Sequence, residues 1–123
     1  MNFNEYQKEA HKTADYNTSL TVGVAVTDGE SLDFKRVPVY PLMKITAEAS
    51  EILDKVCKIV LRGDKPGYLL QSDLLKEVGD DLWYAAERCT VLDVPLEFVA
   101  QVNIAKLHDR LMRGAIHGSG DDR

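Results

Sequence analysis

Two pairs of acidic residues have a spacing that favours the binding of a divalent cation. Glu48 and Glu51 are three residues apart, and so are Glu77 and Asp80. Residues three apart lie on one side of a helix, so each pair would present two carboxylates together. Carboxylate oxygens suit magnesium or manganese, and no histidine or cysteine stands beside these acids to indicate zinc. The four residues are therefore candidate ligands of Mg²⁺, with Mn²⁺ as the alternative.

The apolar stripes of two expected helices support this interpretation. With about 100° of rotation per residue, Glu48 lies roughly 40° from Ile52, and Glu77 lies roughly 60° from Leu74. Each acid thus borders an apolar stripe, and antiparallel packing of the helices would bring the two pairs together. Carboxylates about 4 Å apart repel by roughly 4 kcal/mol at an effective dielectric constant near 20. Such convergence requires cations or shared protons.

The same acids also fit a solvent-exposed helical face. Acidic pairs three residues apart are common on helices, and nearby lysines neutralise them locally. Lys44, Lys55 and Lys58 stand close to the first pair in the sequence. Geometry alone favours this simpler alternative.

Composition limits the classes of protein to consider. The chain has 123 residues and 45% hydrophobic content, which predicts one domain over residues 1–123. A net charge of −5 argues against a polymeric nucleic-acid partner, whereas single nucleotides can be held through metal ions. No stretch approaches the roughly 18 apolar residues of a membrane-spanning helix. Cys57 and Cys89 lack a Cys-x-x-Cys pattern, so we expect reduced thiols in a cytoplasmic protein without a membrane partner.

Hydrophobic periodicity predicts four helices and one insert. Residues 1–16 contain a short amphipathic helix, over 3–15. Residues 17–38 alternate as a strand does, and Asp28-Gly29 is a turn signal, so this insert fits a small β-hairpin or an extended loop. Core helices follow within 40–114: from Tyr40 to Gly63, from a cap at Ser72 or Asp73 to about Leu92, and from Pro95 to Gly114. A Gly-rich tail occupies 115–123.

Three motifs resemble those of a known enzyme family. The runs Glu48-Ala49-Ser50-Glu51 and Glu77-Val78-Gly79-Asp80 resemble the Glu-x-x-Glu and Glu-x-x-Asp signature of the MazG-like nucleoside triphosphate pyrophosphohydrolases. Asp80-Asp81-Leu82-Trp83-Tyr84 is similar to the continuation of that signature, and Asn103-Ile104-Ala105-Lys106-Leu107 with Arg110 is similar to the family's final-helix motif. The likeness covers about residues 40–114, whereas the insert at 17–38 matches poorly.

The resemblance implies an all-α fold, namely a helical bundle of the all-alpha NTP pyrophosphatase type completed in a homodimer or a tetramer of paired dimers. It implies a magnesium-dependent hydrolase that converts an NTP or dNTP and water to the monophosphate and pyrophosphate, in nucleotide-pool control or house-cleaning. All four acids would hold metal, and Glu48 or Glu51 would orient the attacking water. Hydrolysis of phosphoribosyl-ATP is an alternative within the superfamily. A non-catalytic helical dimer that binds a partner is an alternative of another class.

The resemblance also indicates phosphate contacts in the last helix. Asn103, Lys106 and Arg110 lie along one helical face and resemble the family's triphosphate-side residues. Asn103 falls between Ala100 and Leu107 on an otherwise apolar stripe, where a buried amide must find partners or destabilise the fold. Ordinary exposed charges are the alternative for the two cations.

Further substrate contacts are expected elsewhere in the chain. Lys55 and Lys58 resemble family positions near the metal, although ion pairs within the helix explain them almost as well. Tyr84 would stack on a base, or pack in the core or a subunit interface. Arg123 would close over the phosphates from the Gly-rich tail, for which a disordered terminus fits equally well.

Overall fold

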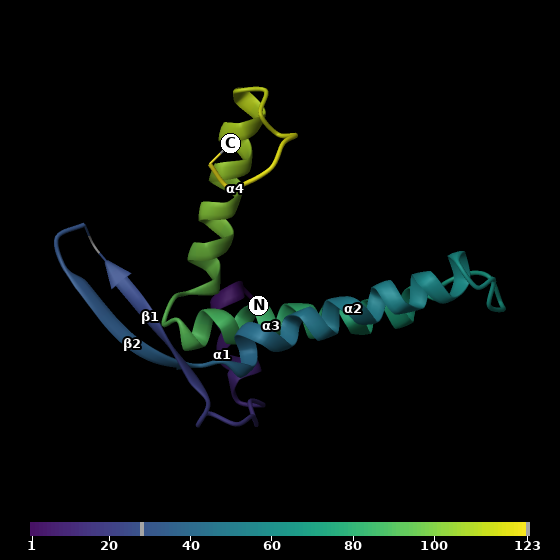
Figure 1. Cartoon of the computed structure of the whole chain (residues 1–123), viewed down its shortest axis with the longest axis horizontal. Coiled ribbons are helices and arrows are strands. Elements are labelled where there is room, and N and C mark those ends of the chain that lie inside the picture. Colours follow the sequence, from purple (N-terminus) through teal and green to yellow (C-terminus); the bar gives the residue numbers. More distant parts are fainter. Residues whose placement is uncertain (28, 123) are drawn as a thin grey trace.

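The computed structural model describes residues 1–27 and 29–122, and it contains four helices and one pair of strands (Figure 1). The predicted helices are confirmed, with ends that differ by a few residues. The third helix begins after Leu70, which offers no side-chain cap, rather than at a cap on Ser72 or Asp73. The order is α1 (Phe3–His11), β1 (Thr21–Thr27), β2 (Leu32–Pro38), α2 (Tyr40–Val60), α3 (Gln71–Val91) and α4 (Leu96–Met112).

The expectation of an all-α fold is wrong, because β1 and β2 form a two-stranded antiparallel sheet. Val22 pairs with Val37 and Val24 with Lys35 along a continuous register. Alternating β-branched residues favour this pleated conformation over a loop, so the insert adopts the hairpin. The molecule is therefore mixed α and β. Asp28, the expected turn residue, lies outside the described residues.

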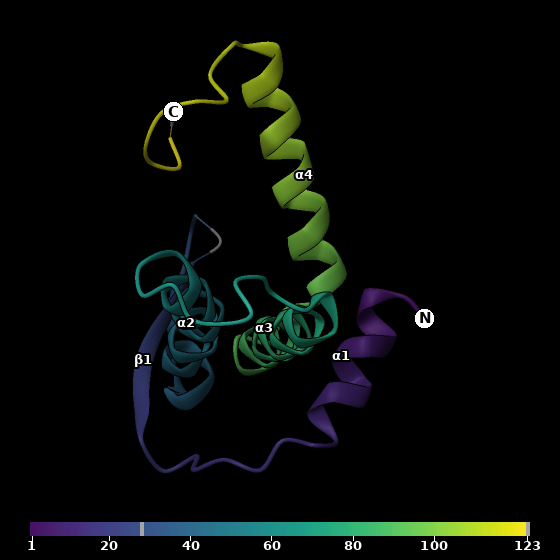
Figure 2. The same ribbon diagram turned by 90° about the vertical axis from the view of Figure 1, so that its right-hand side faces the viewer.

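The two longest helices, α2 and α3, pack side by side in opposite directions (Figures 1 and 2). Pro41 stands in the first turn of α2, where its missing N–H costs nothing. The Arg88 guanidinium, near the end of α3, donates hydrogen bonds to the carbonyl oxygens of Pro41 and Leu42. The start of α2 is thus fixed against the end of α3, and this sets which residues of the two helices face each other.

The buried core lies where α1, α3 and α4 meet. Its members are Ala10, Ala86, Cys89 and Leu96, with Trp83 packed against them. Ala10, Ala86 and Cys89 are small, which allows α1 and α3 to approach closely. The core is small, so hydrogen bonds between the elements contribute visibly to their arrangement.

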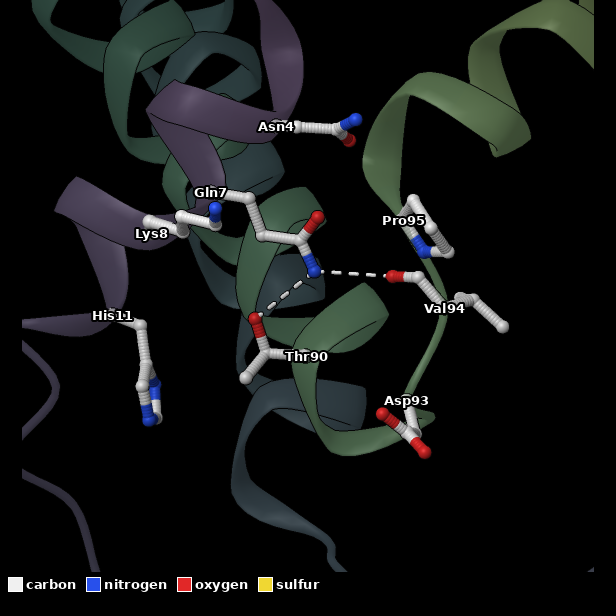
Figure 3. A pocket seen from close by; sticks show the side chains of 8 residues that line it. All are labelled: Asn4, Gln7, Lys8, His11, Thr90, Asp93, Val94 and Pro95. Carbon is white, nitrogen blue, oxygen red and sulfur yellow. Dashed lines mark hydrogen bonds between the residues drawn. The ribbon is translucent and has the colours of Figure 1, made fainter.

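One glutamine on α1 links this core to the start of α4 (Figure 3). The Gln7 amide nitrogen donates to Thr90 Oγ1 at 3.2 Å and to the Val94 carbonyl oxygen at 3.0 Å. The Leu96 backbone N–H donates to Gln7 Oε1 at 2.7 Å. Pro95, the N-cap of α4, has no side-chain oxygen to satisfy these N–H groups. Gln7 therefore caps α4 from another helix.

Helix α4 extends away from the α2–α3 pair (Figures 1 and 2). Its described contacts are with α1 and α3. Among the described residues, no helix combines the length and apolar character needed to cross a bilayer. Because α4 extends away from the α2–α3 pair, many of its large apolar side chains are exposed: Phe98, Val99, Val102, Ile104, Leu111 and Met112.

Candidate metal centre

The packing of α2 on α3 brings three acids together. Glu48 comes from α2, and Glu77 and Asp80 come from successive turns of α3. One carboxylate oxygen from each lies within 4.8 Å of the others. Glu48 and Glu77 are half-buried, while Asp80 is exposed at the mouth of the cluster. Three of the four expected ligands therefore share one site, which we call the acidic cluster.

Glu51 lies outside this group of oxygens. It is exposed on α2, one turn after Glu48. Its charge nevertheless acts on the cluster's surroundings, because it contributes to a raised pKa of Lys55, whose largest cause is the hydrogen bond to Glu77. Glu51 is thus near enough to influence the site without joining the three converging oxygens.

Two lysines partly neutralise the acidic cluster. Lys55 Nζ donates to Glu77 Oε1 at 2.6 Å, and Lys44 Nζ lies 3.5 Å from Glu48 Oε1. Two ammonium groups against three carboxylates leave a net negative charge. Lys58 pairs instead with Asp54 on its own helix, so it does not serve the cluster in this arrangement.

The donor set fits magnesium or manganese. Hard cations prefer oxygen ligands, and Mg–O bonds of about 2.0–2.1 Å place two ligands of one ion at most about 4.2 Å apart. A separation within 4.8 Å therefore requires only small side-chain rotations. Asp81, adjacent to the cluster in sequence, has a buried Oδ1 without a hydrogen-bond partner among the described residues. An uncompensated buried acceptor of this kind is stabilised by a nearby cation.

A cavity of about 310 Å³ adjoins the acidic cluster, lined by Thr13, Glu48, Asp80, Trp83 and Tyr84. The Trp83 indole N–H donates to Thr13 Oγ1 at 2.8 Å, which fixes the ring beside α1. Tyr84 is buried, and its burial raises the pKa of the phenol, as does a hydrogen bond with Tyr40. The cavity therefore combines carboxylates with a fixed aromatic wall.

Comparison with known proteins relates this chain to a phage protein. The Gene 37 protein of Mycobacterium phage L5 is 46% identical over 87 residues, which are 68% of this chain and 75% of the phage protein. The chain belongs to the Gene 37 family. No model of a protein family matches it, and no solved structure matches it. The name of the phage protein states no activity, so any functional argument depends on the site.

In this member of the Gene 37 family, the expected phosphate contacts lie apart from the acidic cluster. Asn103, Lys106 and Arg110 stand on α4, which leads away from α2 and α3 (Figure 2). Asn103 is exposed, so the expected stripe around it is not covered by the described residues of the same chain. Arg110 is buried instead, and Asp121 of the tail contacts both Arg110 and Lys106. Arg123 lies outside the described residues.

Two residues of interest were missed by the sequence analysis. Asp81 lies about 40° from Glu77 on the helical wheel, and this position could have indicated a carboxylate directed toward α2. Asp121 gave no signal, because its contacts with α4 depend on how a Gly-rich tail turns back. Local periodicity contains no information on such a turn.

A larger cavity of about 550 Å³ lies between α1 and the α3–α4 connection (Figure 3). Gln7 spans it with the hydrogen bonds described above, and none of the three clustered acids lines it. Several of its polar residues, namely Asn4, Gln7, His11 and Thr90, form hydrogen bonds that join helices and the α3–α4 connection. The candidate chemistry of the chain therefore belongs to the smaller cavity.

Proposed function

We propose that this chain is a magnesium-dependent nucleoside triphosphate pyrophosphohydrolase, which converts an NTP or dNTP and water to the monophosphate and pyrophosphate. The observation that carries this proposal is the convergence of Glu48, Glu77 and Asp80 from two helices within 4.8 Å. The adjoining cavity offers space of the size that small ligands occupy. The resemblance of residues 40–114 to MazG-like enzymes supplies the reaction class.

The acids of the site have separable roles in this proposal. Glu48, Glu77 and Asp80 would hold the cation, with Mn²⁺ able to replace Mg²⁺. When bound, the ion neutralises phosphate oxygens and lowers the pKa of a coordinated water. Glu51 or Glu48 would accept a hydrogen bond from the water that attacks the α-phosphorus, while the bond to the bridging oxygen breaks and pyrophosphate leaves. Glu51 suits this role because it lies one turn from the clustered oxygens.

The position of α4 supports a site that a second copy completes. Lys106 and Arg110 are carried away from the acidic cluster of their own chain (Figure 2). In a homodimer, or a tetramer of paired dimers, α4 of one copy would supply phosphate contacts to the cluster of another. Lys55, Lys58 and Tyr84 would contribute from the chain that holds the metal. With both cysteines free, we place this activity in the cytoplasm.

One observation favours a non-catalytic alternative. Lys44 and Lys55 already pair with Glu48 and Glu77, so the acidic cluster is partly neutralised without metal. A helical dimer that binds a partner protein would need nothing more. Phosphoribosyl-ATP hydrolysis, the sister activity, uses similar acids and differs in its substrate contacts.

The decisive experiment measures pyrophosphate release from canonical and modified nucleoside triphosphates and phosphoribosyl-ATP, with and without magnesium. We expect magnesium-dependent turnover that Glu77→Gln and Asp80→Asn reduce by at least about a hundredfold. Asp54→Asn is the matched control, because Asp54 pairs with Lys58 outside the acidic cluster. Absence of turnover on every nucleotide by the wild-type protein contradicts the proposed activity and leaves the partner-binding dimer.

A further inference from the structure

The C-terminal tail turns back onto α4. The chain leaves the helix through Gly114, whose φ of 69° is in the left-handed region, and Gly120 adopts a φ of 81°. The Ala115 N–H donates to the Arg110 carbonyl oxygen at 2.7 Å, which closes the end of the helix. Asp121 is thereby returned to the last turns of α4.

Asp121 lies between two cations of α4. Its Oδ1 is 3.1 Å from Lys106 Nζ and 3.4 Å from Arg110 Nη2. Arg110 Nη2 also donates to the Asp121 carbonyl oxygen at 2.7 Å. The pKa of the Asp121 carboxyl is lowered, first by its hydrogen bond with Lys106 and then by the charges of Lys106 and Arg110. The arrangement is an anion-binding site in which the tail supplies the anion.

Burial distinguishes this arrangement from an ordinary surface ion pair. Arg110 is only 4% exposed, although a buried guanidinium needs acceptors that compensate for lost water. The tail provides those acceptors with one carboxylate and two carbonyl oxygens, those of Gly120 and Asp121. The Asp121 side chain itself is 86% exposed. The Arg110 guanidinium is therefore held in place by burial, while the Asp121 carboxylate that pairs with it faces solvent.

The ion pairs of the exposed Asp121 carboxylate are weak enough for another anion to compete with it. Ion pairs that include an exposed partner contribute little to stability, because water and salt screen them. A phosphate group has more negative charge than a carboxylate and three acceptor oxygens, so it pairs more strongly with Lys and Arg. A phosphate group is accordingly a stronger partner for the two cations than the Asp121 carboxylate.

We propose that the tail acts as an internal competitor, in which Asp121 occupies at Lys106 and Arg110 the place of a phosphate group of the ligand. The ligand class is a phosphorylated anion such as a polyphosphate. The tail thus restricts access to these cations until such an anion replaces it. The identification of this anion as part of a nucleotide substrate rests on the proposed function. The competition between Asp121 and a phosphate group for the two cations does not depend on it.

The test measures the binding of inorganic pyrophosphate by titration calorimetry, with the full chain and without divalent metal. Removing the metal keeps the acidic cluster from holding pyrophosphate through an ion. We expect Asp121→Asn to tighten binding by about three- to fivefold, the size of an exposed ion pair, since the competing charge is lost. Asp122→Asn is the matched control, because Asp122 pairs with no cation among the described residues and should change binding less than about twofold.

A second pair of variants keeps the test independent of folding. Asp121→Ala should tighten binding at least as much as Asp121→Asn, and Lys106→Gln should weaken it by about fivefold or more. Equal binding by Asp121→Asn and Asp122→Asn overturns the proposal, and so does a lack of pyrophosphate binding by every variant. Because no hydrolysis is involved, a protein without turnover can still pass this test.

Discussion

At the level of single residues, Lys55 has the most informative position. Its ammonium group donates to Glu77 Oε1 at 2.6 Å. A divalent cation bound by Glu77 would use the same carboxylate. The hydrogen bond raises the pKa of Lys55, so the lysine stays charged at neutral pH. Lys55 would therefore compete with a divalent ion for the Glu77 carboxylate. The strength of the Lys55–Glu77 ion pair thus bears on both interpretations of the acidic cluster, acids neutralised by lysines and acids that bind a metal ion.

Replacing Lys55 with glutamine should tighten metal binding. Without the ammonium group, Glu77 is free to rotate toward Glu48 and Asp80, and repulsion among the three carboxylates favours a cation more strongly. We expect the dissociation constant for Mn²⁺, measured by titration calorimetry, to fall by about three- to tenfold. Lys58→Gln serves as the control, because Lys58 pairs with Asp54 instead. An unchanged constant in Lys55→Gln would show that no metal uses Glu77.

A second group of residues, away from the acidic cluster, makes the stability of the fold decrease at high pH. Glu87 is fully buried, and it accepts hydrogen bonds from Tyr16 Oη at 3.0 Å and from His11 Nδ1 at 3.2 Å. Burial, together with the hydrogen bond to Glu87, raises the pKa of Tyr16 from 10 to about 12. A raised pKa in the folded state means that the neutral phenol is stabilised by folding.

The sign of the resulting pH dependence follows from this shift. The contribution of Tyr16 is complete below pH 10, the pKa of the unfolded chain, and it is lost as pH rises through about 12. Urea unfolding midpoints should therefore decline between these values in the wild-type protein. In Tyr16→Phe the decline should be smaller, since the phenol that ionises is gone. Parallel curves for the two proteins would contradict this assignment.

At the level of elements, Gln7 determines how α4 joins the core. The side chain donates to Thr90 Oγ1 and to the Val94 carbonyl oxygen (Figure 3). It also accepts a hydrogen bond from the Leu96 N–H. These partners belong to the end of α3, the connection and the first turn of α4. The direction of α4, and thus the position of its cations, depends on this side chain.

Gln7→Met should destabilise the fold by about 2–3 kcal/mol. Each lost hydrogen bond costs about 0.5–1.5 kcal/mol, and the partly buried partners are left unsatisfied by an apolar side chain of similar length. Lys8→Met, on the same helix, introduces the same side chain at an exposed position and should cost less than about 0.5 kcal/mol. Urea denaturation of both variants measures the difference. Equal losses would indicate that Gln7 packs without capping α4.

The elements also show what sequence could and could not predict. Periodicity located all four helices, because each has apolar residues at helical spacing, and it placed Glu48, Glu77 and Asp80 beside the apolar stripes of their helices. The same reasoning failed at Asn103, which is exposed, since a stripe shows that a surface is apolar but not what covers it. The strand pairing of the insert was left open, because a lone hairpin and a loop have similar local patterns. The contacts of Gln7 with the distant α3–α4 connection have no local signal at all.

At the level of the whole molecule, large apolar side chains are exposed on several elements. On α3, Val78 and Leu82 continue the stripe that packs on the core, yet both are exposed. On α4, apolar side chains are exposed along most of the helix. Contiguous apolar surface on several elements usually marks an interface. In such an interface, the α4 cations of one copy would lie beside the acidic cluster of another.

We therefore expect the wild-type protein to be a dimer or tetramer at micromolar concentration, and Val102→Glu with Ile104→Glu to dissociate it. Both side chains are about half exposed on α4, at 50% and 52%, so glutamates are tolerated in the free chain but must be desolvated in an interface. The dissociation constant, measured by sedimentation equilibrium, should rise at least about tenfold. Thr18→Glu, which adds one negative charge at an exposed loop position, should leave it unchanged. If the double variant becomes monomeric but keeps full pyrophosphate release, α4 contributes no phosphate contacts across an interface, and each chain completes its own site.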